Sequence, residues 1–339
     1  MATITIKEVA RHAGVSKSTV SRALNDQPHI SKTTRMQVLN AIEELGFQPS
    51  IFARNIKLRK TNTIGVIMSR AIIDLARNPF FRELMDVVES VLSKEGYHFL
   101  FTTIDAHLSR DYTLPKMLIE KRVDGVLMIG HMDDGFLSKL KEENVPFVIT
   151  EDYSENVEIE TVITDDYKGA MKAMRYLIDL GHRRIGFLGG PLQYPSIHNR
   201  YQAYRYSLEE NGIEYKLYID TSLDYNGGYS AGKKVLDSKE RPTALLCAND
   251  WLAAGTIAFL KEAEVKLPSE MSIVGFDNIP LAKETSPPLT TVWASVEEIG
   301  RIAVERLFIQ LNADNPDRLP RKTVVPMELI VRESCSSPL

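Results

Sequence analysis

The sequence predicts a small helical N-terminal domain followed by a larger α/β core made of two doubly wound halves. Two observations support this fold class. Within residues 1–47, stretches with helical periodicity alternate with capping residues and glycines. From Thr63 onward, short apolar runs alternate with helical stretches, and the alternation restarts after Thr161. Such alternation is typical of parallel sheets that are covered by helices on both faces.

Length and composition narrow the class of protein. A chain of 339 residues with 44% hydrophobic and 25% charged residues is typical of a globular protein with two or three domains. No apolar run approaches the ~18 residues that span a bilayer, and the first residues do not read as a secretory leader. The two cysteines, Cys247 and Cys335, have no metal-ligand spacing. We therefore expect a cytoplasmic protein without a metal or other cofactor.

Charge is distributed unevenly along the chain. Residues 1–60 contain ten Lys and Arg against four Asp and Glu, a net charge of +6. Because the whole chain carries −4, the remainder carries −10. A basic head on an acidic body suggests that the head meets a polyanion, whereas a basic tail without function is the alternative.

The head contains the start and stop signals of three short helices. Thr5 opens the first with the pattern of a capping box, Ser16 precedes the second and Ser31 the third. Gly14 ends the first helix and Gly46 the last. Two helices joined at a glycine-containing turn and braced by a third predict a helix-turn-helix domain over residues 1–47.

The second helix combines cations with small hydroxyl side chains. A solvated helix face would explain the charges, but a row of hydroxyls beside two cations suits a helix that enters the major groove of DNA. Lys17 and Arg22 can read guanine, and Ser18 can bond to a neighbouring base edge. We expect Thr19 and Ser21 to hold phosphates, which fix register without specifying sequence.

The stretches "TIKEVARHAGVSKSTVSRALN" and "ISKTTRMQVLNAIEELGFQPS" resemble the DNA-binding head of the lactose-repressor (LacI/GalR) family of bacterial regulators. The resemblance implies that the second helix reads an operator. Its implied DNA contacts in the head are Thr5, Ser16, Lys17, Ser18, Thr19, Ser21, Arg22 and Asn25.

The same resemblance implies a hinge helix and linker over residues 48–61, which enter the minor groove. Ile56 stands where relatives place a leucine that wedges into a base step, and ordinary dimer packing is the alternative role for this side chain. So short a helix is marginal alone in water, so it would form against a symmetry mate and DNA. The implied contacts of this segment are Ala53, Arg54, Ile56 and Lys57.

The body of the chain is similar to the type I periplasmic-binding-protein fold. This similarity implies an effector-binding core over residues 62–339. We expect an N-subdomain of about 62–162 plus 293–323 and a C-subdomain of about 163–292 plus 324–339. Pro115 lies within one expected helical stretch of the first half, so that helix begins or kinks there.

Polar residues follow several predicted strands of the second half. Asn249 and Asp250 follow "LLCA", Asp277 and Asn278 follow "IVGF", and Arg200 follows "IGFLGGP" on a helix. Ligands of open α/β sheets bind beyond the carboxyl ends of the strands. An arginine fork with carboxylate and amide groups suits a polyol such as a sugar, or a nucleobase-like ring. The alternatives are helix caps for Asn249 and Asp250, and a turn for Asp277.

An aromatic wall is expected beside these polar groups. Phe80 and Phe81 begin a helix, and one of the two should face the cleft while the other packs in the core. Leu223 stands where many relatives place an aromatic, with Tyr225 nearby, and this departure leaves the effector class open. The resemblance assigns effector contacts to Arg200, Asn249 and Asp277.

These features predict a regulator and argue against an enzyme. No Ser/His/Asp arrangement or His pair has the context of a catalytic or metal site. We expect a homodimer, with Trp251 and residues 278–291 at the interface, that binds a near-palindromic double-stranded operator. A saccharide effector would release this repressor of carbohydrate-utilisation genes. The alternatives are a co-repressor-dependent regulator that responds to a purine or a phosphoprotein, and a solute-binding receptor.

Overall fold

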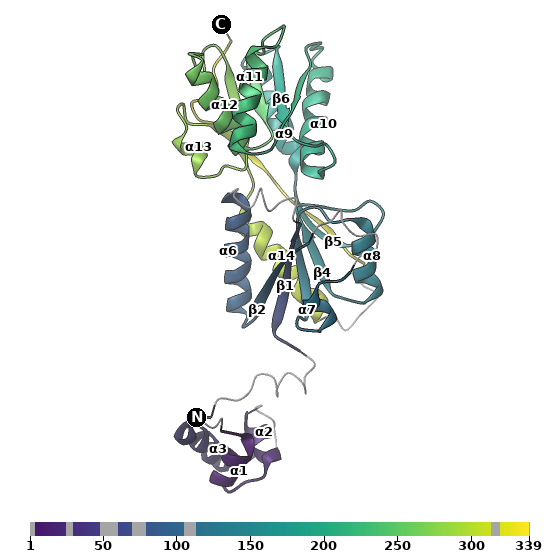
Figure 1. Cartoon of the computed structure of the whole chain (residues 1–339), viewed down its shortest axis with the longest axis vertical. Helices are drawn as coiled ribbons and strands as arrows, with labels where there is room; N and C mark the ends of the chain where they lie inside the picture. The colour runs from purple at the N-terminus through teal and green to yellow at the C-terminus, as the bar shows by residue number, and fades with distance from the viewer. Residues whose placement is uncertain are drawn as a thin grey trace. The chain divides into compact units, whose positions relative to one another are not determined.

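The computed structural model describes residues 4–24, 30–47, 60–69, 79–104, 113–312 and 319–338. The chain divides into two compact units, Met1–Thr61 and Asn62–Leu339, which are described separately (Figure 1). Among the described residues, none of the helices combines the length and the apolar character that a membrane crossing requires.

The first unit contains three helices around a small apolar core. They are α1 (Ile6–His12), α2 (Lys17–Leu24) and α3 (Lys32–Leu45). Each helix contributes two small or β-branched side chains to the centre of this core, which are Val9, Ala10, Val20, Ala23, Val38 and Ala41. The helical head that the sequence predicts is therefore present.

Local capping fixes the ends of these helices as expected. Ser16 Oγ accepts a hydrogen bond from the backbone N–H of Thr19 at 3.1 Å, and Ser31 Oγ accepts one from Thr34 at 3.1 Å. Gly46 ends α3 with a positive φ of 60°, a left-handed conformation that glycine adopts without a steric cost.

The second unit begins with a parallel sheet in the order β11-β5-β4-β3-β1-β2. Every neighbouring pair in this sheet is parallel. Its strands are β1 (Thr63–Ser69), β2 (His98–Ile104), β3 (Gly125–Ile129), β4 (Phe147–Thr150), β5 (Glu160–Thr164) and β11 (Lys322–Val325). Its helices are α6 (Pro79–Lys94), α7 (Lys116–Ile119), α8 (Asp134–Glu142) and α14 (Val296–Leu311).

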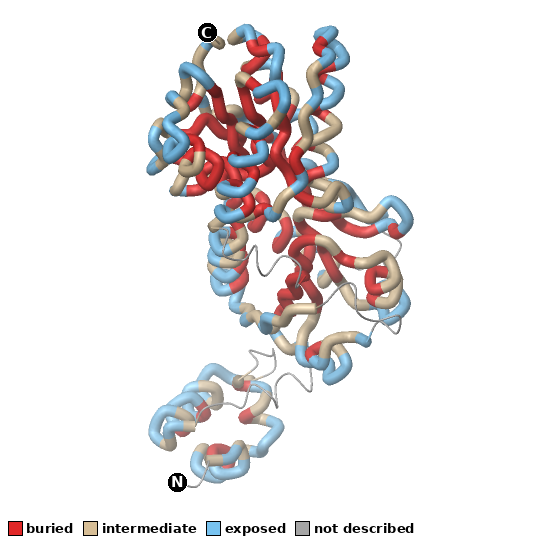
Figure 2. Tube along the Cα trace, turned by 45° about the horizontal axis from the view of Figure 1, so that its top comes forward, coloured by how far each residue is buried: buried red, intermediate tan, exposed pale blue. Residues whose placement is uncertain are grey.

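Alternate residues of this sheet face different helices. Val66 and Leu127 belong to the core cluster that includes α6 and α14, whereas Ile67 and Met128 belong to the cluster that includes α8. Both faces of the sheet are covered, so β1 and β3 are buried along almost their whole length (Figure 2), which explains why they are continuous apolar runs. Helix α7 begins directly after Pro115, so the prediction that this proline starts a helix is confirmed.

A second sheet follows, in the order β12-β10-β9-β8-β6-β7. It is parallel except for β12, which runs antiparallel to β10. Its strands are β6 (Ile185–Gly189), β7 (Leu217–Asp220), β8 (Ala244–Cys247), β9 (Ser272–Phe276), β10 (Thr290–Trp293) and β12 (Glu328–Ile330). Its helices are α9 (Asp166–Asp179), α10 (Pro195–Glu210), α11 (Tyr225–Leu236), α12 (Asp250–Glu262) and α13 (Leu281–Glu284).

The chain passes between the two sheets after β5, after β10 and after β11 (Figure 1). The first sheet keeps β5 up to Thr164 and β11 up to Val325, two residues beyond the expected boundaries at 162 and 323. The second sheet keeps β10 up to Trp293, one residue beyond the expected 292. The predicted fold class of two doubly wound halves is confirmed.

Candidate functional sites

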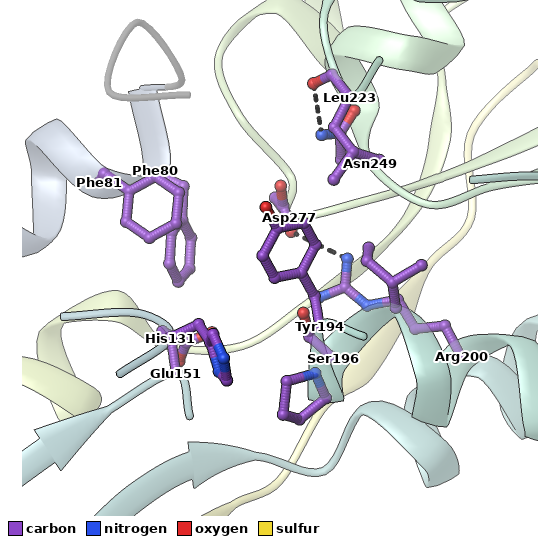
Figure 3. A pocket seen from close by; sticks show the side chains of 12 residues that line it. Phe80, Phe81, His131, Glu151, Tyr194, Ser196, Arg200, Leu223, Asn249 and Asp277 are labelled. Atoms are coloured by element: carbon purple, nitrogen blue, oxygen red, sulfur yellow. Dashed lines mark hydrogen bonds and ion pairs between the residues drawn. The ribbon is translucent and has the colours of Figure 1, made fainter. Parts of the chain in front are cut away.

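A cleft of about 650 Å³, part of it open to solvent, lies between the two halves of the second unit. Figure 3 shows side chains of both halves arranged around a common space. The first half contributes Phe80, Phe81, His131 and Glu151, and the second contributes Tyr194, Pro195, Ser196, Ile197, Arg200, Leu223, Asn249 and Asp277.

The carboxyl ends of the strands create this site. Glu151 directly follows β4 and Asp277 directly follows β9, while His131 and Asn249 come two residues after β3 and β8. Because the strands of each sheet run parallel, their carboxyl ends meet at one edge and bring together residues that are distant in sequence. The sequence prediction of a cleft at this edge matches the position of the pocket.

Arg200 lies in the second turn of α10 and is held from several sides. Its Nε donates to Asp166 Oδ1 at 2.8 Å and its terminal Nη2 lies 2.7 Å from the same oxygen. Nη1 donates to the carbonyl oxygen of Ala248 and lies 3.7 Å from Asp277 Oδ1. The guanidinium carbon also lies 3.8 Å from the ring centre of Phe276. Only 7% of the side chain is exposed, so the guanidinium is fixed before any ligand arrives.

Asp277 and Asn249 line the cleft in two different ways. Asp277 has a positive φ of 97°, and its backbone N–H donates to Val292 at 2.8 Å. Asn249 caps α12, because its Oδ1 accepts from Leu252 N–H at 2.8 Å, while its Nδ2 donates to the Leu223 carbonyl at 2.9 Å. Asn249 therefore caps a helix, as the alternative role predicts, and also lines the cleft.

Asp250 and Asn278, the next residues in the sequence, do not line the cleft, and their side chains stabilise the fold instead. Asp250 Oδ1 accepts from the Thr291 hydroxyl at 2.6 Å, and its Oδ2 accepts from Ile279 N–H at 2.9 Å. Burial and the nearby Asp277 raise the pKa of Asp250 well above its ordinary value. Asn278 Oδ1 accepts from the Arg332 guanidinium at 2.5 Å.

Phe80 and Phe81 both line the cleft, so the expectation that one faces it while the other packs in the core needs correction. Their rings meet edge to face with centroids 5.3 Å apart. Phe80 is only 8% exposed and belongs to the main apolar core as well. Neighbouring positions on a helix normally point in different directions, but at the first turn of α6 both rings reach the cleft (Figure 3).

The sequence predicted Phe80 and Phe81 of the first half at the cleft, but three polar residues in or beside it were not predicted. Glu151, His131 and Asp166 all follow strand ends, which is the signal that identified Asn249 and Asp277. The strand ends on which the sequence-based prediction depends all lie beyond residue 184. The missing residues follow "PFVIT", "VDGVLMIG" and "TVIT" in the sequence.

Electrostatics distinguish Glu151 and His131. Burial and the nearby Asp166 raise the pKa of Glu151 to about 8. His131 Nδ1 lies 3.0 Å from Asp152 Oδ2, and this hydrogen bond raises the pKa of the imidazole. The same Asp152 oxygen accepts from Met132 N–H at 3.0 Å. The cleft is therefore rich in carboxyl groups, with one arginine at its centre.

A second candidate site is the outer face of α2 in the first unit. Val20 and Ala23 are buried against the other helices, whereas Ser16, Lys17, Ser18 and Arg22 are exposed and Thr19 and Ser21 are half-buried. The Ser16 hydroxyl lies 2.7 Å from that of Ser18 and 2.8 Å from that of Thr19. Small hydroxyls beside two exposed cations form a surface that fits a major groove.

Of the remaining predicted DNA contacts, Thr5 lies within the described residues. Thr5 is exposed at the start of α1, where its backbone N–H and hydroxyl donate to Glu8 Oε2 at 2.6 and 2.9 Å. The other predicted contacts lie outside the described residues, and these are Asn25, Ala53, Arg54, Ile56 and Lys57. Within the described part of the chain, no group of three or more His, Cys, Asp and Glu side chains is arranged to hold a metal ion.

Comparison with known families gives two matches. The family model described as bacterial regulatory proteins, lacI family, matches residues 5–50. The family model of the periplasmic binding protein-like domain matches residues 174–335.

Two relatives align with almost the whole chain. The HTH-type transcriptional repressor PurR of Photobacterium profundum is 33% identical, and the match covers 97% of this chain and 98% of the relative. The ribose operon repressor of Haemophilus influenzae is 32% identical, over 98% of this chain and 99% of the relative.

Solved structures agree with these matches. The lac repressor dimer bound to operator and the anti-inducer ONPF superposes with a TM-score of 0.86 at 26% identity, over 99% of this chain and 100% of that chain. The complex of the transcriptional regulator CelR with cellobiose gives a TM-score of 0.72 at 30% identity, over 98% of this chain and 99% of that chain.

Proposed function

Because the chain belongs to the lacI family of bacterial regulatory proteins, and so is a DNA-binding transcriptional regulator and not an enzyme, we propose that it represses carbohydrate-utilisation genes and leaves its operator when a sugar occupies the cleft. In this proposal the protein acts in the cytoplasm as a homodimer. Two copies of the helix-turn-helix head then read the two halves of a near-palindromic operator.

The exposed face of α2 supports the DNA-reading part of the proposal. Lys17 and Arg22 carry donors that suit the O6 and N7 acceptors of guanine. The hydroxyls of Ser16, Thr19 and Ser21 suit phosphate oxygens, which orient the head without specifying bases. The net charge of +6 within residues 1–60 adds affinity that falls as the salt concentration rises.

The observation that carries the effector part is the position of Arg200 in the cleft. Its guanidinium is held between Asp166 and Asp277 and is almost fully buried, so its direction is fixed. A rigid fork of donors beside carboxylate acceptors suits vicinal hydroxyl groups. The aromatic rings of Phe80 and Phe81 add apolar surface against which a sugar ring can pack.

The two halves of the cleft explain how a ligand would act on DNA binding. Glu151 and Phe80 come from the half that contains β1, whereas Arg200 and Asn249 come from the half that contains β6. A sugar that contacts both halves favours the arrangement in which its contacts are complete. Only a ligand that binds one arrangement more tightly than the other changes the affinity for the operator.

A co-repressor of the purine class is the second candidate, because whole-length relatives include a repressor named PurR. The paired phenyl rings of the cleft would also accept a planar nucleobase. The two candidates predict opposite signs, since an inducer weakens the complex with the operator and a co-repressor strengthens it.

The test begins with selection of bound duplexes from a random-sequence library, which supplies the operator. Mobility-shift titrations on this operator then use D-ribose, cellobiose and hypoxanthine, with a scrambled duplex as the control. Release by a sugar supports the proposal, and tightening by hypoxanthine supports the second candidate. The proposal fails if the protein binds selected and scrambled duplexes equally, or if no sugar changes operator affinity.

A further inference from the structure

We propose that Arg332, which follows the last strand of the second sheet, is a positioning residue of the cleft. It holds the turn at Asp277 and Asn278 and thereby fixes the direction in which the Asp277 carboxylate meets a ligand. This inference rests on the proposed function of the cleft as an effector site. It adds a residue that lies outside the cleft lining and is more than fifty positions away from Asp277 in the sequence.

The turn that presents Asp277 has an unusual backbone. Asp277 and Asn278 directly follow β9, and both have positive φ angles, of 97° and 55°. Residues other than glycine seldom adopt this left-handed region, so two in succession persist only where the surrounding contacts hold them. The contacts around this turn therefore determine where the Asp277 carboxylate points.

Two hydrogen bonds anchor the backbone of the turn on either side of Asn278. The Asp277 N–H donates to the Val292 carbonyl oxygen at 2.8 Å, which ties the start of the turn to β10. The Ile279 N–H donates to the buried carboxylate oxygen Oδ2 of Asp250 at 2.9 Å, which ties its end to α12. The side chain of Asn278 is the third point at which the turn is held.

Arg332 provides this third anchor. Its Nη2 donates to Asn278 Oδ1 at 2.5 Å, and its Nη1 donates to the Leu289 carbonyl oxygen at 2.6 Å. Its backbone N–H donates to the Thr290 hydroxyl at 2.9 Å, so the segment after β12 is itself fixed beside β10. The planar guanidinium thus bridges the turn after β9 and the segment before β10, a geometry that suits its rigid fork of donors.

The bridge affects the cleft through the direction of one carboxylate. Asp277 lines the cleft (Figure 3), where its side chain is only 10% exposed and its Oδ1 lies 3.7 Å from Arg200 Nη1. Asn278 does not line the cleft, so the loss of its anchor reaches a ligand by way of the backbone that it shares with Asp277. An acceptor that must be ordered during binding gives a lower affinity than one that is already in place.

Hydrogen exchange of the full-length protein without ligand tests the positioning of the turn. Arg332→Met removes both side-chain donors and keeps an apolar stem. In this variant, the amides of Asp277 and Ile279 should exchange at least about tenfold faster than in the unaltered protein, as followed by mass spectrometry. Peptides from β8 report any global loss of stability and should not change.

Glu333→Gln is the matched control, since Glu333 is exposed and is the next residue of the same segment. It should leave exchange at the turn as it is in the unaltered protein. The proposal is overturned if Arg332→Met leaves exchange at the turn unchanged, or if exchange rises equally in the turn and in β8.

A double-mutant cycle tests whether Arg332 acts through Asn278. Asn278→Gly removes the acceptor, but glycine adopts a positive φ without a steric cost. If the proposal is correct, Arg332→Met should accelerate exchange at Asp277 much less in the Asn278→Gly background than in the unaltered background, because the bridge is already absent. Equal acceleration in both backgrounds would show that Arg332 acts independently of this turn and would overturn the proposal.

The last experiment connects the turn to the ligand. Titration calorimetry with D-ribose, cellobiose and hypoxanthine gives effector affinities, and mobility shifts without effector give operator affinities. For a probe that binds the unaltered protein, Arg332→Met should weaken binding by about tenfold and should leave operator affinity unchanged, a split that a mere loss of folded protein would not produce.

The outcomes separate this inference from the proposed function. Unchanged effector affinity in Arg332→Met would overturn the role given to Arg332, while the proposed sugar effector would stand. If no sugar binds the unaltered protein, the proposed function fails, and hydrogen exchange at the turn still decides whether Arg332 positions Asp277.

Discussion

Arg200 and Asp166 form a buried ion pair at the base of the cleft, with Nε donating to Oδ1 at 2.8 Å and Nη2 lying 2.7 Å from the same oxygen. Asp166 begins α9 and Arg200 lies in α10, so the pair joins the first turn of α9 to the second turn of α10. Arg200 therefore stabilises the packing of the two helices and also lines the proposed effector site.

Replacing Arg200 with alanine should therefore affect stability and effector response together. The substitution leaves the carboxylate of Asp166 buried without its cation, and losing one partner of a buried pair costs about 3–5 kcal/mol. We expect a clear fall in the melting temperature and no response of operator binding to any sugar that acts on the unaltered protein. Thermal unfolding and mobility shifts on the same samples measure both effects.

Arg205→Ala provides the matched control on the same helix. Arg205 is exposed and lies 3.2 Å from Glu209 Oε1 on the surface of α10. Such exposed pairs contribute about 0–1 kcal/mol, so this variant should melt almost as the unaltered protein does and should keep the sugar response. Equal losses in both variants would contradict the role given to Arg200.

A second prediction concerns Arg22 on the exposed face of α2. If Arg22 reads a guanine, alanine at this position should cost about 1–3 kcal/mol of operator binding and relax the preference at one base pair. Thr19→Ala should instead weaken binding to all sequences to a similar extent, because phosphate contacts carry no base information. Competition between operator variants that differ at single base pairs measures both patterns.

Circular dichroism of the full chain controls for folding, since Arg22 lies on the exposed side of a helix whose buried side is formed by Val20 and Ala23. A uniform loss across all operator variants in Arg22→Ala would assign this arginine to the phosphate backbone.

The strand-end rule predicted three of the twelve residues that line the cleft. Arg200, Asn249 and Asp277 line the pocket as that rule requires. The same rule identifies Glu151 and His131, but only when it is applied to both halves of the chain. A single polar residue after one strand is weak evidence for a binding site. The evidence becomes strong only when parallel pairing brings the carboxyl ends of several such strands together.

Other features depend on tertiary contacts that no local pattern reports. The two amide atoms of Asn249 are used by Leu252 and Leu223, and the second partner is distant in sequence. Phe80 and Phe81 both reach the cleft because α6 begins at its edge, a position that helical periodicity does not specify. The subdomain crossings shift by one or two residues because strand pairing, and not composition, decides where each strand ends.

A third prediction follows from His131 and Asp152, whose side chains lie 3.0 Å apart. The pair raises the pKa of the imidazole above its ordinary value of 6.5. The resulting stabilisation is complete below 6.5 and is lost as the pH rises through the raised pKa. The difference in stability between the unaltered protein and His131→Gln should therefore be largest at about pH 6 and should shrink toward about pH 9.

Urea unfolding at several pH values measures this difference, and the contribution of Glu151 cancels because both proteins contain it. His98→Gln is the control, since His98 is exposed on the edge strand β2. A difference that is constant with pH would show that His131 acts through packing alone.

The final prediction concerns the close contact between α11 and α12. A Cβ at Gly255 would lie 1.9 Å from the carbonyl oxygen of Tyr225, and a Cβ at Gly228 would lie 2.0 Å from that of Leu252. Helix propensity alone predicts that Gly255→Ala stabilises α12 by about 1 kcal/mol. The backbone clash should reverse that sign and cost about 1–3 kcal/mol or more, because two helices must separate.

The melting temperature of Gly255→Ala should therefore fall. The sign of the change shows whether helix propensity or the packing of α11 against α12 dominates at this position. Gly212→Ala is a useful comparison, since Gly212 has a positive φ of 62° but a Cβ there meets nothing within 4 Å. Its cost should be about 1–2 kcal/mol, from backbone strain alone. A stabilising Gly255→Ala would contradict this prediction, because it would show that α11 and α12 accept an added methyl group at this contact.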